Sequence, residues 1–181
     1  FKKLRGAVRV GPFDRELTVV AGENEEGKST IFEAIRTVLF ERHRVTGQTA
    51  QSFLPYGSKV RPEIQLDFEL DGEAYSIRKA FVMSPEAELV TPTGRYVGDE
   101  AEKALASLLT LKPLDRGAST SEHEGPWGYF WVGQGASTHL PSPSRDARES
   151  IRLALESEIG EVLGGKASTL VLERVNDEHL E

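Results

Sequence analysis

The chain has 181 residues, of which 38% are hydrophobic and 28% are charged, an ordinary balance for a folded domain with one substantial core. It contains no cysteine, which excludes a disulfide framework, thiolate catalysis and cysteine zinc sites. No stretch reads as a signal sequence or a membrane span, so we expect a cytoplasmic protein without a membrane partner.

The net charge of −7 is unevenly distributed along the chain. Residues 1–61 carry 11 lysines and arginines against 7 acidic residues, whereas residues 62–181 carry 11 against 22. The basic N-terminal third could serve polyphosphate or a nucleic-acid backbone. An equally weighted alternative is that these charges are solvated on an exposed face.

The N-terminal part predicts two strands and then a helix. Residues 1–10 place apolar side chains at strand spacing before the turn signal Gly11–Pro12, and residues 17–21 form a second apolar run. From Lys28, apolar residues at i, i+3, i+4, i+7 and i+8 predict a helix that packs on a sheet and ends near Glu41 or Arg42. The apolar positions are Ile31, Ala34, Ile35, Val38 and Leu39. The next stretch, residues 43–61, is turn-rich and predicts an irregular connection.

A glycine-rich loop lies between the second strand and the helix, and it matches the P-loop pattern G-x-x-x-x-G-K-[ST] completely. Its two glycines permit backbone amides to curl around an anion, Lys28 can reach the β and γ phosphates, and Ser29 offers a hydroxyl to Mg²⁺. The sequence therefore predicts ATP and Mg²⁺ as cofactors. The predicted nucleotide-binding residues are Gly22, Asn24, Glu25, Glu26, Gly27, Lys28, Ser29 and Thr30, with Lys28 also catalytic and Ser29 a metal ligand.

Three carboxylates, those of Glu23, Glu25 and Glu26, lie in the same loop. Pointing inward, they would repel phosphate. We therefore expect their side chains to face solvent while the backbone amides face the ligand.

Downstream of residue 61 the pattern predicts antiparallel hairpins and a helix. Residues 63–70 alternate well, Asp71–Gly72 is a strong turn signal, and residues 74–82 continue the hairpin. Residues 84–98 predict a smaller hairpin, and Asp99–Glu100 begin a helix that stops before Pro113.

The remaining residues alternate between flexible and apolar stretches. Residues 113–126 predict a loop, and Tyr129 to Val132 predict a short buried strand ending at Gly133-Gln134-Gly135. A helix is expected between Ala147 and Val162, and another from about Leu170. Trp127, Tyr129, Phe130 and Trp131 are interpreted as core residues rather than base-stacking ones. The four histidines lack ligand spacing and are expected at the surface: His43, His123, His139 and His179.

Taken together, these features resemble the N-terminal ATPase lobe of the SMC and SbcC family of DNA-repair and chromosome-structure ATPases. The resemblance rests on the strand and turn ahead of the P-loop, the loop from Gly22 to Thr30, the Asp71–Gly72 hairpin and the aromatic run into Gln134. It implies an α/β fold: a P-loop NTPase lobe with a mixed sheet over residues 1–165, and the start of a coiled coil over residues 166–181.

The resemblance also implies a function and partners. Gln134 corresponds to the Q-loop glutamine, which is catalytic and completes the Mg²⁺ shell. ATP hydrolysis would need a C-terminal lobe, of the same protein or a separate chain, because Ser168 to Glu173 is interpreted as the start of a helix rather than a Walker B strand. Further implied partners are a second head that dimerises on ATP, DNA and a nuclease subunit, with a nucleoid association if the protein is bacterial.

Two other functions stay open at this point. One is a self-contained P-loop kinase, for which residues 113–148 hold Arg116, Arg145 and Arg148 but no convincing Walker B strand is present. The other is a nucleotide-dependent binding module that does not hydrolyse ATP.

Overall fold

The computed structural model describes residues 1–4, 6–14, 16–55, 57, 60–112, 114, 116–132, 148 and 152. The chain divides into two compact units, residues 1–124 and residues 125–181, and each is considered by itself. Several predictions lie outside the described residues: Gln134, most of the helix between Ala147 and Val162, the Ser168 to Glu173 segment and the coiled coil after residue 166. No described helix is long and apolar enough to cross a membrane.

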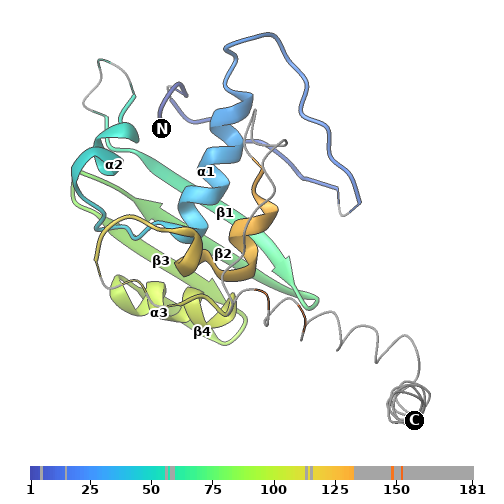
Figure 1. Ribbon diagram of the computed structural model, residues 1–181, viewed down its shortest axis with the longest axis vertical. Helices are drawn as coiled ribbons and strands as arrows, with labels where there is room; N and C mark the ends of the chain where they lie inside the picture. Colours follow the sequence, from blue (N-terminus) through green and yellow to red (C-terminus); the bar gives the residue numbers. More distant parts are fainter. Residues whose placement is uncertain are drawn as a thin grey trace, which may run out of the picture. The chain divides into compact units, whose positions relative to one another are not determined.

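The first unit is built on a four-stranded sheet in the order β1-β2-β3-β4, with every neighbouring pair antiparallel (Figure 1). The strands are β1 Glu63–Leu70, β2 Glu73–Ala80, β3 Glu86–Thr91 and β4 Gly94–Val97. The helices of this unit are α1 Lys28–Phe40, α2 Gly47–Ser52, α3 Asp99–Leu108 and α4 Ser121–Glu124.

One face of the sheet is apolar and is covered by helices. Leu66 pairs with Ile77, and Ile77 pairs with Leu89, so alternate positions of three strands place their side chains on the same face. Val38 of α1 and Leu105 of α3 pack into the same buried cluster as Ile77 and Leu89. The hydrophobic core therefore lies between the sheet and these two helices.

The opposite face of the sheet is polar. Arg78 of β2 lies 3.4 Å from Glu63 on one neighbouring strand and 3.4 Å from Glu88 on the other. Arg95 of β4 approaches Glu88 at 2.7 Å. Because the same strands carry apolar residues on one face and charges on the other, the sheet packs helices on one side only within the described residues.

The two strands predicted before the P-loop are wrong: no described residue before Lys28 is in a strand. The chain ahead of α1 runs as an extended loop that joins no strand (Figure 1). Leu17 and Val19 are 77% and 78% exposed. An apolar alternation favours an extended backbone, but a strand also needs a neighbour to hydrogen-bond with, and the described residues provide none here. The predicted mixed sheet is accordingly wrong as well; the observed sheet is antiparallel throughout.

The helix after the P-loop and both hairpins are confirmed. α1 ends at Phe40, with Val38 buried and the other four residues of its apolar stripe half-buried. Asp71 and Gly72 both have positive φ, 53° and 81°, as a two-residue hairpin turn of the primed type requires. α3 is also confirmed, although it begins at Asp99 and Gly98 occupies the capping position.

Two predicted connections and one predicted strand have a structure that the sequence did not indicate. Residues 43–61 include α2, whose Ala50 packs with Phe53 and Phe81 in a second buried cluster. Residues 113–126 include the short helix α4. In the second unit, the expected strand from Tyr129 is wrong, because residues up to Phe130 form the 3₁₀ helix η1, Gly125–Phe130. Phe130 is 71% exposed, so the expected core role of this aromatic group is also wrong for that residue.

Candidate nucleotide-binding site

The glycine-rich loop ends in a left-handed turn that leads into α1. Gly27 caps the helix with φ 95° and ψ 15°. A Cβ at this position would stand 3.0 Å from Cδ2 of Leu4, so both the backbone conformation and the neighbouring side chain favour glycine. The turn at Gly27 therefore depends on the residue that the motif specifies.

The backbone amides of residues 27–30 have no hydrogen-bond acceptor within the described part of the chain. The amides of the first turn of any helix lack an intrahelical partner, and α1 has neither a side-chain cap nor an acidic residue in its first turn. The positive end of the helix dipole adds to the same region. This arrangement is suited to an anion with several acceptor oxygens, such as a polyphosphate.

Lys28 closes the loop into a ring. Its Nζ donates a hydrogen bond to the carbonyl of Gly22 at 2.8 Å and another to the carbonyl of Glu23. These two bonds hold the ammonium group beside the open amides and leave its third hydrogen for a ligand. The observed geometry thus holds the Lys28 ammonium at the glycine-rich loop, where the sequence motif predicts a positive charge.

The two hydroxyl residues after Lys28 differ in exposure. Ser29 is exposed, so its hydroxyl is accessible to a cation bound beside the phosphates. Thr30 is buried, and its Cβ lies 4.0 Å from the Cβ position of Gly27. Ser29 therefore fits the predicted role of metal ligand, whereas Thr30 offers its amide rather than its side chain.

One of the three loop carboxylates makes a contact that the sequence did not indicate. Glu23 and Glu25 are exposed, as is the side chain of Glu26. The Glu26 carboxylate nevertheless turns back on the loop and accepts the amide of Glu23 at 2.8 Å. The side chain of Glu26 is thus exposed, as expected, but its carboxylate also accepts a loop amide, which the expectation did not include.

At the far end of α1 lies a buried ionic network that the sequence did not reveal. Lys79 of β2 is fully buried, and its Nζ bonds to Oε2 of Glu102 at 2.7 Å and to the carbonyl of Glu41 at 2.9 Å. Glu102 also accepts the amide of His43 at 2.7 Å and its Nδ1 at 2.9 Å. His43 is only 1% exposed, so the prediction that it is a surface residue is wrong.

The charges in this network shift one another's pKa. Burial raises the pKa of the Glu102 carboxyl, but the Lys79 ammonium and the hydrogen bonds from His43 and Lys79 outweigh burial and lower it to about 2. Burial lowers the pKa of Lys79, while Glu102 opposes that effect. The network joins the C-terminal end of α1 to β2 and α3, which fixes the helix that begins at the loop. Its residues are distributed over three segments of the sequence, so no local pattern could have identified it.

No catalytic carboxylate can be assigned within the described residues. Asp67 of β1 lies on the polar face of the sheet, where it accepts hydrogen bonds from Ser76 and Gln65. These bonds lower the pKa of Asp67 and account for its conformation without a ligand. No described group of three or more acidic or histidine side chains could hold a metal ion.

An α/β unit in which backbone amides without an acceptor lie at the start of a helix is consistent with a nucleotide-binding domain. Residues 1–115 match the AAA domain family, and the chain belongs to that family. No curated protein matches the chain. Its N-terminal region is therefore of the P-loop ATPase type, and nucleotide binding with ATPase-type chemistry is the function that the family indicates.

Proposed function

We propose that this chain is the ATP- and Mg²⁺-binding half of an SMC/SbcC-like ATPase head that couples ATP hydrolysis to DNA binding or processing. The observation that carries the proposal is the Lys28 ring, in which the ammonium group is held on the carbonyls of the loop that leads into the uncapped first turn of α1. A polyphosphate would satisfy the amides of that turn and contact the ammonium at the same time.

The cofactors fit the residues that are present. The amides of residues 24–30 and Lys28 would hold the phosphates, and the Ser29 hydroxyl would hold Mg²⁺, with Gln134 as the second metal ligand suggested by the resemblance. When bound, Mg²⁺ neutralises developing charge on the phosphates. The chain's own contribution is to fix a positive charge and a set of donors before the ligand arrives.

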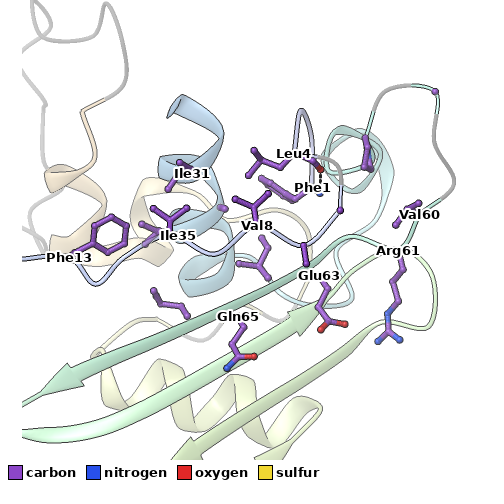
Figure 2. Close-up of a pocket in the computed structure, with 18 residues that line it drawn as sticks. Phe1, Leu4, Val8, Phe13, Ile31, Ile35, Val60, Arg61, Glu63 and Gln65 are labelled. Atoms are coloured by element: carbon purple, nitrogen blue, oxygen red, sulfur yellow. Dashed lines mark hydrogen bonds between the residues drawn. The ribbon is translucent and has the colours of Figure 1, made fainter. Parts of the chain in front are cut away.

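Exposed apolar side chains support a further lobe as partner, from the same protein or a separate chain. Leu17 and Val19 project from an extended segment that has no neighbouring strand among the described residues. A cavity of about 780 Å³ lies between the N-terminal segment, α1 and the edge strand β1. Figure 2 shows Val8 and Ile35 on one side of this space and Glu63 of β1 on another. Strands and apolar side chains supplied by another lobe would cover these surfaces.

The remaining partners follow from the proposed class. A second head would clamp ATP by dimerising, and DNA would bind the basic N-terminal third. Several cations there are engaged in ion pairs, including Lys2 with Glu33 and Arg44 with Asp99, whereas Lys3 and Arg9 are exposed. DNA binding would therefore depend on the exposed cations and fall steeply with salt. A nuclease subunit and a cytoplasmic, nucleoid-associated location complete the proposal.

Calorimetric titration of the chain with MgATP tests the proposed site. The wild-type chain should bind, Lys28→Ala should lose nearly all affinity while keeping its circular dichroism spectrum, and Lys3→Ala should bind as the wild type does. Unchanged binding by Lys28→Ala would contradict the site. Multiple-turnover hydrolysis by the chain alone would contradict the half-head, and transfer of phosphate to a small acceptor would favour a kinase instead.

A further inference from the structure

The exposed side chain of Glu26 folds back against its own loop. Its Oε2 accepts the Glu23 amide at 2.8 Å and is in contact with the position where a Cβ of Gly22 would stand. Cδ of Lys28 lies 3.7 Å from that same position. The carboxylate and the stem of the lysine therefore flank one glycine, so a negative charge already lies against the loop that would receive the phosphates.

A carboxylate in this position affects a bound polyphosphate in two ways. It occupies a backbone donor of the loop, and it adds a like charge close to the phosphate oxygens. Glu25 is also in the loop and is exposed, but it makes no hydrogen bond or ion pair among the described residues. Of these two neighbouring carboxylates, only Glu26 is attached to the ring.

We propose that Glu26 determines the affinity of this loop for nucleotide, as an internal anion that competes with the incoming phosphates. The inference rests on the proposed nucleotide site and concerns its regulation. In the empty loop the carboxylate holds the Glu23 amide; a polyphosphate repels the carboxylate, so part of the binding free energy is spent on releasing it. The loop then binds nucleotide more weakly than the same loop without this charge.

The test compares Glu26→Gln with Glu25→Gln in the 181-residue chain. Both substitutions remove one negative charge from the loop, but only the first removes the charge that bonds to the Glu23 amide. The probes are MgATP and inorganic tripolyphosphate, titrated at low ionic strength, where screening is weakest. Glu26→Gln should tighten binding of both by about two- to fivefold, the range for one partly screened charge. Glu25→Gln should change it by less than half as much.

A second readout follows the contact itself. In the NMR spectrum of the free chain, the Glu23 amide should shift in Glu26→Gln and in Glu26→Ala and stay in place in Glu25→Gln. Tripolyphosphate added to the wild type should move this amide toward its position in Glu26→Ala, because the ligand displaces the carboxylate. If one substituted chain fails to fold, the other Glu26 variant gives the same comparison.

The outcomes separate the inference from the proposed function. If the wild type binds and Lys28→Ala does not, the nucleotide site stands whatever Glu26 does. Equal affinities of Glu26→Gln and Glu25→Gln would then overturn the competitor role, and weaker binding by Glu26→Gln would show that the carboxylate braces the loop instead. A wild type that binds neither probe would overturn both, because Glu26 would have no ligand to compete with.

Discussion

Nζ of Lys79 lies 2.7 Å from Oε2 of Glu102, and neither group has much contact with water. Lys79 is fully buried near the end of the inner strand β2, whereas Glu102 comes from the first turn of α3. Because Glu102 also accepts two hydrogen bonds from His43, this one carboxylate joins α3 to the sheet and to the segment that follows α1. The position of α1, the helix that follows the glycine-rich loop, thus depends on the ion pair between Lys79 and Glu102.

Glu102→Gln should destabilise the chain by about 3 kcal/mol, because it leaves the Lys79 charge buried without a counter-ion. The free energy of unfolding in urea measures the effect. Glu100→Gln, an exposed change on the same helix, is the matched control and should leave the unfolding midpoint unchanged. Equal midpoints for the two variants would show that water or another carboxylate compensates Lys79.

Acid should weaken the folded state through the same carboxyl. The pKa of Glu102 falls from its ordinary 4.5 to about 2 in the folded chain, so its contribution is complete above pH 4.5 and is lost as the pH falls toward 2. The loss amounts to about 3 kcal/mol over that window. Urea midpoints measured between pH 6 and pH 2 should fall more steeply for the wild type than for Glu102→Gln; parallel curves would contradict the assignment.

Gly27→Ala should impair the loop for two reasons that can be separated. The φ of 95° disfavours any Cβ by about 1–2 kcal/mol, and the new methyl group would also press on Leu4. MgATP affinity should fall sharply. In the double variant Gly27→Ala with Leu4→Ala the steric contact is removed, so stability should recover in part while affinity stays low. Full recovery of affinity would mean that the contact with Leu4, and not the backbone angle, required glycine.

Gln134→Ala should behave differently from Lys28→Ala, since the role proposed for Gln134, a ligand of Mg²⁺ and water, contributes more to the chemical step than to ground-state phosphate binding. In the head assembled with its C-terminal lobe, MgATP binding should survive and turnover should fall. The comparison of the dissociation constant with kcat measures this split. Hydrolysis at the wild-type rate would make Gln134 a turn residue only.

The sequence by itself determined the elements whose signals are local. A period of 3.6 from Ile31 to Leu39, the alternation of residues 63–70 and the Asp71–Gly72 turn each specify their structure within a few residues, and α1 and the hairpins form where they predict. The P-loop motif is likewise local, which is why the position of Lys28 beside open amides could be anticipated.

Only the tertiary structure determined which extended segments pair with another strand and which polar side chains are buried. Residues 17–21 have the pattern of a strand, but a strand needs hydrogen bonds from a second one, and among the described residues β1 to β4 pair only with one another. His43 and Lys79 each look like surface residues in the sequence but are buried, and the half-buried Glu102 bonds to both, because charges that leave water must compensate one another. The motif also does not predict the contact between Glu26 and the Glu23 amide. It accepts any residue at position 26, and only the folded loop determines where that side chain points.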